Sequence, residues 1–411
     1  MSEFALTLWA WELTGSATAL ALVGFFSLLP RIFISIFAGI IVDRANRKYL
    51  MMLGDAIAAI STLFILLLHL SGNLAIWHLY LAASVNGGFG QIQQLAYSTS
   101  ITLLVSTQNY TRANSMNSVV HYGSNIIAPA IAGILYPIIG LGGILPIDLA
   151  TFFVAIATLI WIRIPQPVRE QREQGGRGGR DKLSVFWSEV TFGIRYIWQR
   201  DSLRTLLLVT ASFWFVHDLA ETVGDPMVLA RSDNNSQVLG AIFSAAGIGG
   251  VTGAVVLGAW GGTQRRVNGM LAGFVGAGVA KAIFGLGQNL TIWLPAQFCS
   301  SLNFPLLGSS ETALWMEATP PELQGRVFAA NSLVLELVSA IATLIAGPLS
   351  DRILEPAMQS ENSFSSLFAP IFGSGTGAGM ALLYAICAIA MFSIGTVSFR
   401  LPRLHQLDET L

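Results

Sequence analysis

Stretches of about 20 mostly apolar residues recur from residue 17 to residue 400, and they constrain the fold more than any other feature of this chain. An α-helix of that length crosses the hydrocarbon core of a bilayer. We predict eleven such spans, at 17–41, 50–70, 76–99, 117–139, 143–163, 203–224, 237–260, 267–287, 291–314, 327–349 and 377–400. Charged residues make up only 11% of the 411 residues, which excludes a disordered chain, a disulfide-built secreted domain and an ordinary cytosolic enzyme. The chain is therefore predicted to be an all-α membrane protein.

The rest of the composition narrows what the chain can bind. A net charge of −1 provides no overall basic field, so we predict no nucleic-acid partner. Cys299 and Cys387 are too few and too far apart to indicate a metal or redox site, and we predict no metal and no cofactor. The phosphate-binding pattern G-x-x-x-x-G-K-[ST] does not occur, so ATP is not expected to be the energy source.

The loops between the spans alternate in charge. Lys and Arg concentrate in every second loop, as at Arg44, Arg47 and Lys48 after the first span. Because basic loops stay on the cytoplasmic side, we predict a multi-pass protein of the inner or plasma membrane with these loops in the cytoplasm. The stretch from Phe4 to Trp11 is apolar but only half a span long. We therefore expect the chain to begin inside its first helix, with both termini cytoplasmic in the full-length form.

The composition changes once along the chain and divides it into three parts. Residues 1–164 form a predicted N-terminal transmembrane half, and residues 203–411 form a C-terminal half with a short tail. Between them, residues 165–202 begin with a segment rich in Pro, Gln, Gly and Arg, which is typical of a flexible linker. The apolar residues of 183–198 then follow helical spacing, which predicts a helix lying on the cytoplasmic face of the membrane.

The two halves share a repeated pattern. Arg112, Asn117, Ser118, Ala132 and Gly133 are matched in the second half, each at an offset of 214 residues. The matching residues are Arg326, Asn331, Ser332, Ala346 and Gly347. Two parallel repeats are one architecture of secondary transporters, in which the substrate binds between the halves near the membrane midplane.

The loop after the first complete span carries a family motif. It reads Gly39-Ile-Ile-Val-Asp43-Arg44-Ala-Asn-Arg47-Lys48 and matches the G-x-x-x-D-R-x-x-R-R/K loop of the major facilitator superfamily. The chain resembles a twelve-helix member of that superfamily, and more narrowly the drug:proton antiporter group that includes macrolide efflux proteins and the enterobactin exporter. Further phrases that support this are Thr14-Gly15-Ser16-Ala17, Gln324-Gly325-Arg326-Val327-Phe328 and Gly347-Pro348-Leu349-x-Asp351-Arg352. The resemblance implies the major facilitator fold, two six-helix halves related by pseudo-two-fold symmetry, with the first helix truncated here.

The resemblance also implies a gate on the cytoplasmic side. Asp43 lies where a carboxylate can meet the positive end of a neighbouring helix, and the family places that helix at Gly325 and Arg326. We predict a gating motif formed by Gly39, Asp43, Arg44, Arg47, Lys48, Arg112, Gly325 and Arg326. The alternative for the cations is simple anchoring to the anionic leaflet. The second half retains only a worn copy of the loop, in which Gly262 stands in place of the aspartate.

Ionisable and polar residues inside the spans are the other candidate functional groups, because burying them in hydrocarbon costs free energy. We predict that the proton-coupling or substrate-binding residues come from Arg31, Asp55, His121, Asn125, Asp218, Glu221, Glu311 and Glu336. Glu336 lies about ten residues into its span and is the first choice as proton carrier. The alternatives are a buried structural pair for Glu336 and Arg31, and contact with water for Asp218 and Glu221. Lys281 is expected to extend outward toward the head groups.

These observations lead to a prediction of function. We predict a secondary active transporter that exports a small amphipathic organic compound or drug, such as a macrolide, by proton antiport with alternating access. The partners are the small molecule, protons and the lipid bilayer, and the protein is expected to act as a monomer. The alternatives are a facilitator or importer of a small metabolite and a non-transporting membrane scaffold or sensor. A membrane-embedded enzyme is disfavoured because the loops contain no metal-ligand cluster or nucleophile motif.

Overall fold

The computed structural model describes residues 1–104, 110–162 and 191–409, and every regular element among them is helical. The chain forms two compact units. The N-terminal unit contains residues 1–14 and 22–178, and the C-terminal unit contains residues 15–21 and 179–411.

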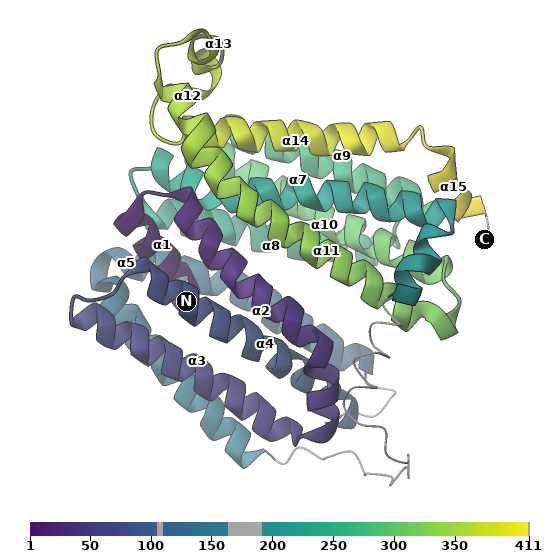
Figure 1. The fold of residues 1–411 in the computed structure, drawn as a ribbon, viewed down its shortest axis with the longest axis horizontal. Helices are drawn as coiled ribbons and strands as arrows, with labels where there is room; N and C mark the ends of the chain where they lie inside the picture. The colour runs from purple at the N-terminus through teal and green to yellow at the C-terminus, as the bar shows by residue number, and fades with distance from the viewer. Residues whose placement is uncertain (105–109, 163–190, 410–411) are drawn as a thin grey trace. The chain divides into compact units, whose positions relative to one another are not determined.

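The N-terminal unit is built from long helices that lie side by side (Figure 1). They are α1 Ser2–Thr14, α2 Ala17–Arg44, α3 Arg47–Leu70, α4 Ile76–Leu104 and α5 Tyr110–Trp161. The 52 residues of α5 cover two predicted spans, and the helix is interrupted at Gly140, where φ is 61° and ψ is −172°. Glycine is suited to this position because a side chain rarely adopts positive φ.

Close helix packing in the N-terminal unit depends on a small residue of α4. A Cβ atom at Gly87 would clash with the carbonyl oxygen of Ser27 in α2, so the two helices meet at their backbones. Near the end of α2 and the start of α3, a small apolar cluster includes Ala38, Val42 and Leu50. These contacts hold together the helices that flank the predicted gating loop.

The C-terminal unit contains the remaining helices (Figure 1). Its long helices are α7 Asp201–Arg231, α8 Ser236–Trp260, α9 Arg266–Leu286, α10 Leu290–Glu317, α11 Pro321–Leu349 and α14 Ala378–Ser398. A π-helical turn, η2 Ser350–Leu354, continues α11 into α12 Glu355–Gln359 and is followed by α13 Ser363–Phe372. A short helix, α15 Pro402–Glu409, ends the described chain.

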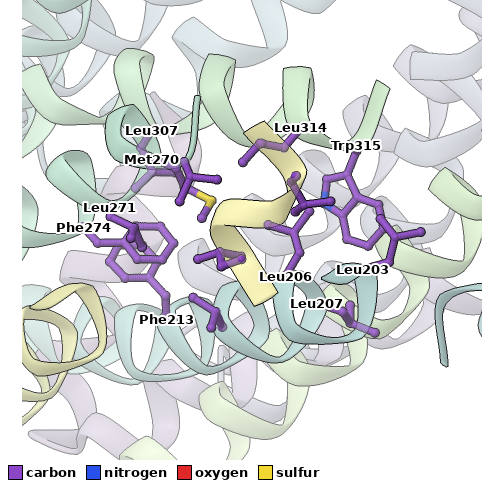
Figure 2. Close-up of a cluster of buried hydrophobic side chains, with 14 of the residues drawn as sticks. Leu203, Leu206, Leu207, Phe213, Met270, Leu271, Phe274, Leu307, Leu314 and Trp315 are labelled. Atoms are coloured by element: carbon purple, nitrogen blue, oxygen red, sulfur yellow. The ribbon is translucent and has the colours of Figure 1, made fainter. Parts of the chain in front are cut away.

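The core of the C-terminal unit forms where α7, α9 and α10 meet (Figure 2). The rings of Phe213 and Phe274 stack with centroids 3.7 Å apart and planes within 7°. Leu307 and Trp315 of α10 are buried in the same cluster. Such interlocking fixes the faces that α7 presents to its neighbours, which include the polar residues one turn beyond Phe213.

Each of the eleven predicted spans coincides wholly or largely with a described helix, with residue 163 outside the described residues, and the half-length first stretch corresponds to α1. Eight of the described helical segments are long and apolar enough to cross a membrane. Of the predicted helix at 183–198, only 191–198 lies among the described residues, and that part is helical. Ile197 is buried there in the core of the C-terminal unit, while 56% of Trp198 is exposed. The linker at 165–182 lies outside the described residues.

Candidate functional site

The predicted gating loop contains two cations that bind helix carbonyl oxygens. Asn46 caps α3 by accepting a hydrogen bond from the backbone N–H of Lys48 at 3.0 Å. Arg47 Nη1 donates to the carbonyl oxygen of Thr99 in α4 at 2.7 Å. The ammonium group of Lys48 donates to the carbonyl oxygens of Ile160 and Ile162 at the end of α5, both at 2.9 Å. Since helix C-termini carry partial negative charge, both cations join helices of the N-terminal unit.

The other members of the predicted gate are placed less fully. Gly39 and Asp43 lie near the end of α2, and Arg112 lies near the start of α5. The side chains of Asp43, Arg44 and Arg112 are outside the described part of the structure. In α11, a Cβ atom at Gly325 would meet nothing within 4 Å, and the Arg326 guanidinium lies 5.4 Å from the ring centroid of Phe192.

Two charged candidates of the N-terminal unit bind glutamine side chains of α4. Arg31 Nε donates to Gln91 at 3.0 Å, and Asp55 accepts from Gln93 Nε2 at 2.7 Å. In each pair the hydrogen-bond partner of the charged group is a neutral side-chain amide. The side chains of His121 and Asn125 lie outside the described residues.

In the C-terminal unit, the expectation for Lys281 is wrong. Its side chain is 0% exposed and does not extend outward. It forms a very short ion pair with Glu221 of α7, and its ammonium group lies 3.2 Å from the Tyr384 hydroxyl of α14. The pair stabilises both charges inside the bundle, which explains why this lysine turns inward.

Glu221 has an intermediate environment. It lies deep in the unit beside Lys281, yet 46% of its side chain is exposed. Together with Asp225, Gln297 and Tyr384 it lines a cavity of about 40 Å³. A space of this size can hold a water molecule between polar groups.

His217 lies one turn before Glu221 and connects the same cluster to a set of aromatic rings. Its Nδ1 is 3.1 Å from Asp218 Oδ1, and its Nε2 is 3.9 Å from Glu221 Oε1. The rings of Trp214 and Phe304 each lie 5.1 Å from the imidazole, centroid to centroid. The imidazole therefore has carboxylates at both nitrogens and aromatic side chains around it.

Glu311 is the most buried of the predicted carboxyl groups. It is 8% exposed and accepts a hydrogen bond from Trp214 Nε1 at 3.3 Å. Among the described residues, no Lys, Arg or His nitrogen lies within ion-pair distance of it. Glu336, the first choice from the sequence, is half-buried in α11.

The sequence profile described as Major Facilitator Superfamily matches residues 2–343 of this chain. The chain belongs to this superfamily. The predicted superfamily and the predicted all-α fold class are both confirmed.

The chain is similar in sequence to two named efflux proteins and in fold to a solved transporter structure. The chain is 25% identical to macrolide efflux protein A of Streptococcus pyogenes over 354 residues, which cover 85% of each protein. It is 23% identical to the multidrug efflux pump Tap of Mycolicibacterium fortuitum over 404 residues, covering 96% of this chain and 90% of Tap. Its fold is similar to that of a bacterial homolog of the human lysosomal transporter Spinster, with a TM-score of 0.65, 17% identity, and coverage of 100% and 94%. The chain is thus a multi-pass membrane transporter and not an enzyme.

Sequence reasoning found the carboxylates of this site but missed their partners. Lys281 and Tyr384 lie in helices whose other residues are mostly apolar. The spacing of residues within one helix cannot identify a partner in another helix. A lysine near the middle of an apolar run is nevertheless a signal, because its burial requires an anion.

Proposed function

We propose that this superfamily member exports a small amphipathic organic compound or drug by proton antiport with alternating access. Its similarity to a macrolide efflux protein and a multidrug efflux pump supports export, and carboxyl groups at membrane depth support proton coupling. Its place is the inner or plasma membrane, with the basic loops in the cytoplasm, and it acts as a monomer. Of the rival functions, a facilitator and a scaffold require no exchangeable proton.

The observation that carries the proposal is the position of Glu311. It is a buried carboxyl group whose described partner is a neutral indole N–H. Without a cation beside it, the ionised form is costly in hydrocarbon, so the group favours the protonated form until water or substrate reaches it. Glu221 is different, because Lys281 stabilises its ionised form. We therefore place Glu311 before Glu336 as the carboxyl group that carries a proton.

Transport of erythromycin and ethidium in proteoliposomes tests the proposal. An imposed pH gradient should drive uphill transport by the wild type, and Glu311→Gln should abolish the dependence on the gradient while leaving substrate binding intact. Glu317→Gln is the matched control, because Glu317 lies in the same helix but forms a more exposed pair with Arg266 at 3.9 Å. If the wild type transports these compounds only down their gradients, proton antiport is excluded for them.

The cytoplasmic gate remains part of the proposal. Asp43 would gate access from the cytoplasm, supported by its motif and by the loss of the aspartate at Gly262. Asp43→Asn should insert normally and suppress export. Normal export by a normally expressed variant would exclude a gating role for the carboxylate.

A further inference from the structure

The four linked side chains of the C-terminal unit do not balance in charge. Asp218 and Glu221 contribute two negative charges, Lys281 contributes one positive charge, and a neutral His217 contributes none. The sum is −1 when the histidine is neutral and zero when it holds a second proton. Asp225, which lines the same cavity as Glu221, adds a further negative charge. A net negative charge inside a low-dielectric bundle costs free energy, so the cluster favours binding a proton.

His217 is the group best placed to accept that proton. Free histidine changes charge between about pH 5 and 8, and its charged form donates from both ring nitrogens. Here Nδ1 faces Asp218 at 3.1 Å and Nε2 faces Glu221 at 3.9 Å. The rings of Trp214 and Phe304 lie 5.1 Å from the imidazole, centroid to centroid, at interplanar angles of 66° and 80°.

We propose that His217 is a second proton-binding site of the transporter, distinct from Glu311, and that it takes part in coupling. A proton delivered through water binds the unprotonated ring nitrogen and gives an imidazolium held between Asp218 and Glu221. Its release to water restores the neutral ring. The coupling role rests on the proposed antiport, whereas proton binding by the cluster does not.

The surroundings provide water and a defined set of charges. The cavity lined by Glu221, Asp225 and Tyr384 reaches the Glu221 carboxylate, so water can reach the cluster from that side. The groups that face the site are Asp218, Glu221 and Asp225 on α7, Lys281 on α9, Glu311 on α10, which accepts a hydrogen bond from Trp214 of α7, and Tyr384 on α14. Helix α11 packs against α7. Glu336 lies 15 residues after the first residue of α11, and His217 lies 16 residues after the first residue of α7.

Proton binding can be measured directly by NMR of the purified full chain labelled with 15N-histidine. Comparison with His217→Gln assigns the ring, and we expect it to change from neutral to charged between pH 8 and pH 5. Asp218→Asn carries one negative charge fewer next to the ring, so the imidazolium should form at a lower pH in that variant than in the wild type. A His217 ring that stays neutral down to pH 5 would overturn the proposal.

Coupling is then tested in proteoliposomes with erythromycin and ethidium as probes. His217→Gln should lose most of the stimulation by the pH gradient and keep downhill exchange. His78→Gln is the matched control, because His78 is equally buried but bonds only the backbone of Ala75. Unchanged gradient dependence in His217→Gln removes the coupling role. A wild type that titrates at His217 but shows no gradient-driven transport instead refutes the proposed antiport.

Discussion

The charged side chains of the two units have different kinds of partner. In the N-terminal unit, the described bonds of the charged candidates go to neutral groups, namely the amides of Gln91 and Gln93 and helix carbonyl oxygens. In the C-terminal unit, Glu221 and Lys281 form an ion pair with a histidine beside it. The repeat does not carry this ion pair, because the counterparts of Glu221 and Lys281 at the 214-residue offset are the neutral Thr7 and Leu67.

The difference separates packing from chemistry. Both units bring helices together at glycine, at Gly87 in α4 and at Gly249 and Gly253 in α8. Only the C-terminal unit adds the linked cluster around His217. We infer that the repeat preserves the packing that both halves need, while the linked cluster around His217 belongs to the C-terminal half alone among the described residues.

The largest expected effect comes from separating the buried ion pair. Glu221→Gln leaves Lys281 at 0% exposure without its counter-ion, which should reduce the free energy of unfolding by about 3–5 kcal/mol. The double variant Glu221→Gln/Lys281→Met removes both charges and should recover most of the loss. Thermal unfolding in detergent, followed by size-exclusion chromatography after heating, measures the shift.

The control for this comparison is Glu317→Gln, which breaks the exposed pair with Arg266 and should cost less than about 1 kcal/mol. Equal losses for Glu221→Gln and Glu317→Gln would show that the interior pair is not special. A double variant no more stable than Glu221→Gln would show that the two side chains act through other contacts.

The sequence determined the fold far better than the partners within the site. Apolar runs and alternating loop charge follow from the bilayer itself, so the spans could be predicted approximately, although α7 continues to Arg231 and α11 begins at Pro321, both beyond the predicted bounds. The path of Lys281 could not, because its direction depends on Glu221, 60 residues earlier, and Tyr384, 103 residues later. Depth in the span favours Glu336 from sequence alone, whereas the burial of Glu311 depends on how α7 and α10 pack.

The next largest loss of stability is expected at the glycines where helices meet closely, a kind of contact that both units contain. In α8, a Cβ atom at Gly253 would clash with the carbonyl oxygen of Leu302, while one at Gly258 meets nothing within 4 Å. Gly253→Ala should cost about 1–3 kcal/mol because α8 and α10 must separate. Gly258→Ala should be neutral or stabilising, since alanine favours helix over glycine by about 1 kcal/mol.

The same pair of substitutions exists in the N-terminal unit. Gly87 meets the backbone of Ser27, and Gly90 in the same helix is open. If packing is what the halves share, Gly87→Ala should be destabilising and Gly90→Ala should not, as measured by the same unfolding assay. A tolerated Gly87→Ala would mean that only the C-terminal unit depends on close backbone contact.

A smaller effect is expected at two helix caps in the C-terminal unit. Asp351 accepts hydrogen bonds from the backbone N–H groups of Ala17 and Thr18 at 3.2 and 2.8 Å and from the Ser16 hydroxyl at 2.7 Å. Asp351→Ala should cost about 1–2 kcal/mol, the usual range for a lost cap, and Asp351→Asn should cost less because an amide oxygen still accepts. Glu355→Ala, which uncaps α14, provides a second measurement. Identical stability for Asp351→Ala and the wild type would exclude a capping role.

The smallest change in the free energy of unfolding is expected where the partner of a charged side chain is neutral. Asp55 accepts from Gln93 Nε2 at 2.7 Å, and Asp55→Asn keeps an acceptor oxygen at the same position. Because the hydrogen bond can re-form and no cation is left unpaired, the substitution should change the free energy of unfolding by less than about 1 kcal/mol. Gln93→Leu removes the donor instead and should be more harmful, since it leaves the Asp55 carboxylate without this bond. Comparison of Asp55→Asn with Glu221→Gln by thermal unfolding therefore measures the difference between the units. A loss at Asp55→Asn as large as at Glu221→Gln would show that the charge of Asp55 itself is needed, and the contrast between neutral and ionic partners would have to be abandoned.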